Sequence, residues 1–115
     1  MFTAAMLVPS SFQSNFVPEI TTPVLNTSWL FHGQNISANA TYTDYESDLG
    51  TVIFRWYVNN TNVFNETFND IANGTVVNAT LASSNYTKHN IINVSVQAFD
   101  GFTYTAINWS LTAYV

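Results

Sequence analysis

The sequence predicts an all-β domain, an antiparallel β-sandwich of about six to eight short strands with an extended segment before it. Three observations support this fold class. Apolar and polar residues alternate with period two in several stretches, turn-forming residues separate those stretches, and no stretch sustains a helical period. At 115 residues, the chain is long enough for one sandwich core and too short for a second.

The clearest strand is predicted over residues 50–58. Its β-branched and aromatic residues alternate in phase, and a turn-rich cluster at residues 59–62 ends it. We expect this segment to be the central core strand. Its inner face is predicted to carry Val52, Phe54, Trp56 and Val58, and its outer face Ile53, Arg55 and Tyr57.

The other elements are predicted in chain order. Residues 19–28 form an edge strand or an extended entry segment, because Pro18 and Pro23 cannot donate within a central ladder. A turn follows at residues 30–33. Further strands are predicted over residues 35–42, 63–68, 77–81 and 92–98, with turns at Asn73-Gly74 and Asp100-Gly101.

The last strand is predicted over residues 107–113. Its apolar phase is Ile107, Trp109, Leu111 and Ala113, and its polar phase is Asn108, Ser110 and Thr112. The inner faces of the strands together predict one core. Besides the central strand, we expect that core to contain Ile36, Tyr42, Val94, Val96 and Trp109.

The charge composition excludes several classes of partner. The net charge is −5, and Arg55 and Lys88 are the only lysine or arginine residues, so no basic patch can form for nucleic acid or an anionic membrane surface.

The apolar stretch near the start ends at Pro9 and lacks a positive flank, so it fits neither a transmembrane span nor a standard signal peptide. Without cysteine, the core must be stabilised by burial rather than by disulfides.

The positions of the asparagines along the chain are typical of a glycoprotein. Ten of the fifteen asparagines begin an Asn-x-Ser/Thr triplet, whereas chance would give about three. These acceptors lie in predicted turns or on the polar phase of strands, and none clearly lies on an apolar phase. Since only 8% of the residues are charged, N-linked glycans would supply the solubility that charges do not, which predicts an extracellular or cell-surface protein. The acceptors are Asn26, Asn35, Asn39, Asn59, Asn65, Asn73, Asn78, Asn85, Asn93 and Asn108.

Residues 1–18 differ from the sandwich predicted for residues 19–115. They contain no charged residue and no complete triplet, and Phe2, Ala4, Met6 and Val8 alternate along them. A free tail of this composition would expose apolar surface, so we expect it to be covered. It either packs on its own domain as an edge strand or adds as a strand to the sheet of an identical neighbouring subunit. A disordered terminus is the remaining alternative.

A calcium site is one hypothesis for the acidic residues. Asp44, Glu46 and Asp48 alternate just before the central strand, and Asp100 lies in a turn that a sandwich can bring to the same end. Oxygen ligands from two loops suit calcium. A solvated acidic loop, with Asp100 capping its own turn, would explain the same residues without a metal.

The sequence gives no indication of catalysis. His32 and His89 are isolated, and the chain has neither a Gly-x-Ser-x-Gly turn nor a cysteine nucleophile. Paired carboxylates could cleave glycosides, but that chemistry needs a cleft that a domain of this size rarely has. We assign no catalytic residue and expect no enzyme activity.

Four short motifs occur in a characteristic order. They are Ala40-Thr41-Tyr42-Thr43-Asp44, Phe54-Arg55-Trp56-Tyr57-Val58-Asn59, Asn73-Gly74-Thr75 and Val94-Ser95-Val96-Gln97-Ala98-Phe99-Asp100-Gly101. With them, residues 35–115 resemble the PKD-like, immunoglobulin-like repeat domains of archaeal and bacterial cell-surface proteins. The resemblance implies an immunoglobulin-like β-sandwich of about seven strands, with Trp56 in its core. It also implies a spacer, adhesion or assembly module of an exported protein, and no reaction.

Two functions remain open at this level. In the first, the chain is a structural subunit of a surface fibre or layer, assembled by strand addition and coated with N-linked glycans. In the second, it is an adhesin or carbohydrate-binding module. The second would use outward-facing aromatics such as Tyr57. The sequence leaves three roles open for the outward-facing Ile53, Tyr57 and Phe99: lying under glycans, contacting another subunit, or stacking on a sugar.

Overall fold

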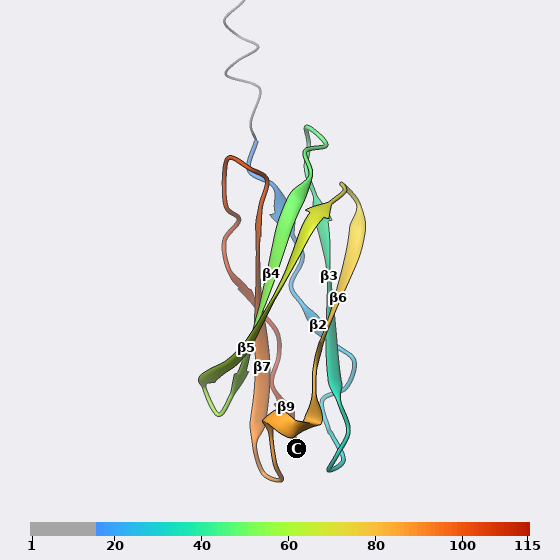
Figure 1. The fold of residues 1–115 in the computed structure, drawn as a ribbon, viewed down its shortest axis with the longest axis vertical. Coiled ribbons are helices and arrows are strands. Elements are labelled where there is room, and N and C mark those ends of the chain that lie inside the picture. The colour runs from blue at the N-terminus through green and yellow to red at the C-terminus, as the bar shows by residue number, and fades with distance from the viewer. Residues whose placement is uncertain (1–15) are drawn as a thin grey trace, which may run out of the picture.

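A computed structural model describes residues 16–115 (Figure 1). They form two antiparallel β-sheets packed face to face, with one short 3-10 turn at Ser83–Asn85. The predicted fold class is therefore confirmed. No helix within this part of the chain is long and apolar enough to cross a membrane. The segment with Phe2, Ala4, Met6 and Val8, proposed for assembly, lies outside the described residues.

The larger sheet is built around β4 (Gly50–Val58). β4 pairs with β5 (Thr61–Ile71) on one side and with β7 (Ile91–Phe99) on the other. β7 pairs in turn with two short strands, β8 (Asn108–Trp109) and β9 (Ala113–Tyr114). The prediction that β4 is the central strand is thus confirmed, whereas β5 is longer than the predicted residues 63–68.

The smaller sheet is built around β3 (Ile36–Thr43). β6 (Thr75–Leu81) pairs along one side of β3, and β1 (Glu19–Ile20) and β2 (Val24–Leu25) share the other side. Pro23 lies between β1 and β2, which agrees with the predicted edge position, since proline cannot donate within a ladder.

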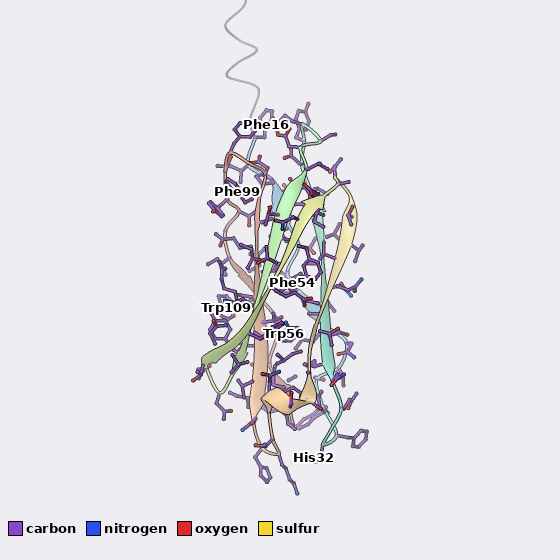
Figure 2. The ribbon with its side chains drawn as sticks, viewed as in Figure 1. Phe16, His32, Phe54, Trp56, Phe99 and Trp109 are labelled. Atoms are coloured by element: carbon purple, nitrogen blue, oxygen red, sulfur yellow. The ribbon has the colours of Figure 1, made fainter. Side chains whose placement is uncertain are left out.

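The core lies between the two sheets (Figure 2), and alternation predicted most of it correctly. Trp56, Phe54 and Tyr42 are the largest fully buried side chains. The indole nitrogen of Trp56 is buried and, among the described residues, has no hydrogen-bond partner. The inner faces of β3, β4, β6 and β7 are buried throughout: Ile36, Ala38, Ala40, Tyr42, Val52, Phe54, Trp56, Val58, Val77, Ala79, Leu81, Ile92, Val94, Val96 and Ala98.

The predicted last strand was wrong in phase. Trp109 pairs with Ser95, and Ala113 pairs with Ile92. Between these two pairs the C-terminal segment advances by four residues, whereas β7 advances by only three. Such an extra residue is a β-bulge, and it moves the side chains before it to the opposite face. Ala113 is buried as predicted, whereas Trp109 is 47% exposed and Leu111 is 87% exposed.

Two residues that were predicted to lie on the polar, outer face of this segment, Ser110 and Asn108, are instead buried or half-buried. Ser110 is buried, and its hydroxyl oxygen accepts the Val94 backbone N–H at 3.0 Å. Asn108 pairs with the core residue Val96 and is half-buried, rather than lying on the outer face. Ile107, predicted to be in the core, is exposed.

Candidate functional site

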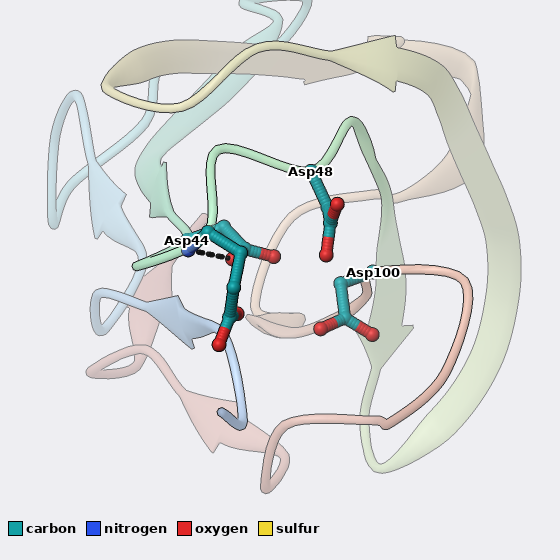
Figure 3. A group of neighbouring side chains, drawn as sticks. Asp44, Asp48 and Asp100 are labelled. Atoms are coloured by element: carbon teal, nitrogen blue, oxygen red, sulfur yellow. Dashed lines mark hydrogen bonds between the residues drawn. The ribbon is translucent and has the colours of Figure 1, made fainter. Parts of the chain in front are cut away.

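The four acidic residues of the calcium hypothesis meet at one end of the sandwich (Figure 3). Asp44, Glu46 and Asp48 lie on the loop between β3 and β4, and Asp100 lies on the turn that follows β7. One carboxylate oxygen from each lies within 4.8 Å of the others. Asp44 and Asp100 are each 2% exposed, and Glu46 and Asp48 are half-buried.

Backbone hydrogen bonds fix three of these carboxylates. Asp44 accepts the Glu46 N–H at 2.8 Å, and its second oxygen lies 3.2 Å from the Tyr42 hydroxyl. Glu46 accepts the Phe16 N–H at 2.8 Å through Oε2. Asp100 caps its own turn, because Oδ1 accepts the N–H groups of Phe102 and Thr103 at 2.9 and 2.7 Å.

Two buried carboxylate oxygens of the cluster take no part in these hydrogen bonds. Within residues 16–115, Asp100 Oδ2 and Glu46 Oε1 are buried and have no hydrogen-bond partner. A buried carboxylate oxygen without a donor is costly, since it has lost its water and gained no replacement. The cluster therefore contains more hydrogen-bond acceptors than the donors in residues 16–115 satisfy.

The cluster is strongly negative. Burial, together with the charges of Asp44 and Asp100, raises the pKa of Asp48. Burial is also the main reason why the pKa of Tyr42 is raised, and the neighbouring Asp44 adds to the effect. The chain has only two cationic side chains of the Lys/Arg type, and both lie in other elements: Arg55 in β4, where it bonds Gln97, and Lys88 in the loop before β7.

Tyr42 and Gly50 position the acidic loop. The Tyr42 hydroxyl lies between the Asp44 carboxylate and the Asp48 carbonyl oxygen, which is 3.0 Å away, so it holds both ends of the loop. The Tyr42 ring packs directly on Gly50, where a Cβ would lie 2.3 Å from Cζ of the ring. Only glycine leaves room for the ring at this first residue of β4.

Most glycosylation triplets lie on the surface. Eight acceptor asparagines are exposed: Asn26, Asn35, Asn39, Asn59, Asn65, Asn73, Asn78 and Asn85. The other two, Asn93 and Asn108, are half-buried, and the serines that complete their triplets, Ser95 and Ser110, are buried. The Asn108 side-chain nitrogen also donates to the Ile20 carbonyl at 2.7 Å.

An aromatic pair lies on the outer face of the larger sheet. The rings of Tyr57 and Trp109 have centroids 5.0 Å apart, and with Asn60 and Asn93 they line a hollow of about 350 Å³. Sequence reasoning found Tyr57 but missed Trp109, because the bulge that turns it outward has no sequence signal of its own. Of the other predicted outward residues, Ile53 and Phe99 are half-buried, and Phe99 stacks on Tyr104.

A mostly apolar groove of about 420 Å³ runs between β2 and the C-terminal segment. Residues 22–25 and 27–28 line one side, and residues 109 and 111–112 line the other. Val24, Trp109 and Leu111 are exposed along it. The groove was also missed, since Trp109 and Leu111 were predicted to be in the core.

The remaining candidate residues do not gather into a site. His32 lies in the turn before β3 and His89 lies in the loop before β7, and both are exposed. Neither belongs to the carboxylate cluster.

No family model and no curated protein matches the sequence. Among solved structures, the fold is similar to the PKD domain of an M14-like peptidase from Thermoplasmatales archaeon SCGC AB-540-F20, with a TM-score of 0.62. The two chains are 19% identical, and the match covers 86% of this chain and 92% of the other. At this identity the likeness concerns the fold. The chain therefore has the immunoglobulin-like β-sandwich fold of a PKD domain, as the order of its motifs predicted.

Proposed function

We propose that this chain is a non-enzymatic structural glycoprotein of the cell exterior, whose subunits join by strand addition. In this proposal, the part of the N-terminal segment (residues 1–18) that precedes Phe16 in one subunit adds to the groove between β2 and the C-terminal segment of the next. The observation that carries it is the groove itself, which leaves apolar side chains in water beside strands too short to cover them.

The groove and the N-terminal segment are complementary in character. The segment is uncharged and alternates Phe2, Ala4, Met6 and Val8, so an extended strand would present these side chains on one face. The groove offers exposed Val24 and Leu111 to such a face. Strand addition obtains affinity from main-chain hydrogen bonds and specificity from the alternate side chains.

The connectivity favours a chain of subunits. Phe16 lies at the end of the sandwich that carries the acidic loop (Figure 2), and fifteen residues precede it. Fully extended, such a segment spans at most about 50 Å, enough to reach along a neighbouring domain. Because donor and acceptor surfaces differ, the contact is head-to-tail, and it propagates instead of closing into a dimer.

Deleting residues 1–12 is expected to give folded monomers that do not polymerise, because the donor strand is lost and the sandwich core is retained. Light scattering and electron microscopy measure the assembly, and circular dichroism measures the fold. In the full-length chain, Leu111→Asp should block the acceptor groove. Val76→Asp, which changes another exposed apolar residue on β6 outside the groove, should not.

Two outcomes would contradict strand addition. The truncated chain could still form the same assembly as the full-length chain. Alternatively, the truncated monomer could melt far below a full-length monomer at equal concentration, which would mean that the segment packs on its own domain.

The glycan part of the proposal rests on how the asparagine side chains are held. In four exposed triplets the side-chain oxygen accepts a backbone N–H: Asn26 from Ser37, Asn35 from Ser83, Asn59 from Ile91 and Asn73 from Asp44. An amide oxygen that faces the protein turns the amide nitrogen away from it. Since a glycan is attached through nitrogen and leaves the carbonyl oxygen in place, these bonds are compatible with glycosylation.

Glycosylation is therefore expected at the eight exposed asparagines and absent at Asn93 and Asn108. At both of these positions the triplet serine is buried, and at Asn108 the acceptor nitrogen is already bonded within the fold. Asn85 also donates from this nitrogen, to the Ala82 carbonyl at 3.1 Å, but in an exposed turn. Glycopeptide mass spectrometry of native material measures occupancy site by site. Full occupancy at Asn108, or none at Asn59 and Asn73, would contradict the assignment.

A further inference from the structure

We propose that the four carboxylates at the end of the sandwich bind one calcium ion. Calcium takes six to eight oxygen ligands at about 2.4 Å, so two oxygens on the same ion lie at most about 5 Å apart. One oxygen from each of Asp44, Glu46, Asp48 and Asp100 lies within 4.8 Å of the others, which is the spacing a single ion requires. In Figure 3, Asp44, Asp48 and Asp100 surround a common space between the acidic loop and the turn.

Two of the three buried, partnerless carboxylate oxygens in residues 16–115 belong to this cluster, which favours a metal site over a solvated acidic loop; the third, Glu66 Oε1, lies in β5. Asp100 is 2% exposed, and capping of its turn accounts for Oδ1 only, whereas Oδ2 is buried without a donor anywhere in residues 16–115. Glu46 shows the same division, with Oε2 bonded to Phe16 and Oε1 buried and partnerless. A solvated loop would keep these oxygens in water. A cation between them compensates both the lost hydration and the repulsion among four negative groups.

The donor set favours calcium over other metals. All four side chains offer oxygen, and the cluster contains neither of the histidines and no sulfur, so zinc and copper lack their preferred ligands. Magnesium demands near-ideal octahedral geometry and gives up its waters reluctantly. Carboxylates from two separate loops form a more adaptable site, which suits the larger ion.

The ion would also act on the start of the sandwich. Glu46 accepts the Phe16 N–H, and the Phe16 ring packs edge-on against Tyr45 with centroids 4.9 Å apart. A calcium ion that fixes Glu46 therefore also fixes Phe16, the first described residue. This consequence rests on the proposed function: calcium would hold the donor segment in the orientation that reaches the next subunit.

Thermal melting of the full-length chain, first treated with chelator, tests the site. Calcium chloride is expected to raise the melting temperature by about 5–10 °C, and magnesium chloride at the same concentration by much less. Asp48→Asn is the most direct variant, because the hydrogen bond that Asp48 accepts from the Tyr42 hydroxyl goes to its backbone carbonyl and not to its carboxylate. It should reduce calcium affinity at least tenfold by titration calorimetry. Asp44→Asn should do the same. Asp70→Asn, an exposed carboxylate in β5, is the matched control and should keep the full response.

A wild-type melting temperature that does not respond to calcium overturns the site, as does an Asp48→Asn chain that responds like wild type. Electron microscopy of the same samples tests the coupling, with longer assemblies expected in calcium than in chelator. A calcium response with assembly of equal length in both conditions overturns the coupling and retains the site. A calcium response in a chain that never assembles overturns the proposed function alone.

Discussion

Replacing Trp56 by alanine is expected to lower the free energy of unfolding by about 3–5 kcal/mol. Trp56 is fully buried in β4, where it pairs with Val94 of β7, and its ring belongs to the core between the two sheets. The cost combines the lost transfer free energy of the ring with the cavity that remains, because a close-packed sandwich relaxes only in part. Urea denaturation followed by far-UV circular dichroism measures the change.

Trp109→Ala is the matched control for this prediction. It removes the same side chain from a position that is 47% exposed on the outer face, so it is expected to cost no more than about 1 kcal/mol. Equal losses for the two variants would contradict the outward phase of the C-terminal segment, and with it the β-bulge that precedes Ala113.

Gly50→Ala is expected to destabilise the fold by about 1–3 kcal/mol and to weaken the calcium response. The new Cβ would lie 2.3 Å from Cζ and 2.5 Å from Cε1 of the Tyr42 ring, and this ring is fully buried and cannot swing into solvent. Any shift of the ring displaces its hydroxyl, which holds Asp44 and Asp48 together. Urea denaturation and calcium titration measure the two effects.

Tyr42→Phe separates the packing of the Tyr42 ring on Gly50 from the hydrogen bonds that the Tyr42 hydroxyl makes. It removes the hydroxyl and keeps the ring, so the penalty for Gly50→Ala should persist in the Tyr42→Phe background. A Gly50→Ala chain as stable as wild type would show that the ring does not pack on residue 50.

The sequence predicted the inner faces of β3, β4, β6 and β7 correctly, because burial of one face of a regular strand imposes strict alternation on its residues. The C-terminal segment could not be assigned in the same way. One extra residue opposite β7 reverses its phase, and such a bulge depends on which backbone groups find partners in the folded sheet, as Ser110 does with Val94.

The carboxylate cluster was predictable as a set of residues but not as a site. A sandwich brings the loop before β4 and the turn after β7 to one end, so Asp44 and Asp100 could be expected to be neighbours. Which oxygen of Asp100 is capped and which lacks a donor depends on the conformation of its turn, where Gly101 has a φ of 95°. The groove lined by Trp109 and Leu111 could not be predicted either, because it depends on the β-bulge in the C-terminal segment.

The position of Phe16 determines how the domain would respond to mechanical load. Tension applied through the N-terminal segment enters at the acidic end and passes directly into β1 and β2, which run along the length of β3. Pulling along this direction loads several bonds at once, among them Thr21 N–H to the Thr41 carbonyl, Asn26 N–H to the Ser37 carbonyl and the Asn108 amide to the Ile20 carbonyl. The first strands would therefore resist by shear, with their hydrogen bonds sharing the force, instead of opening one bond at a time.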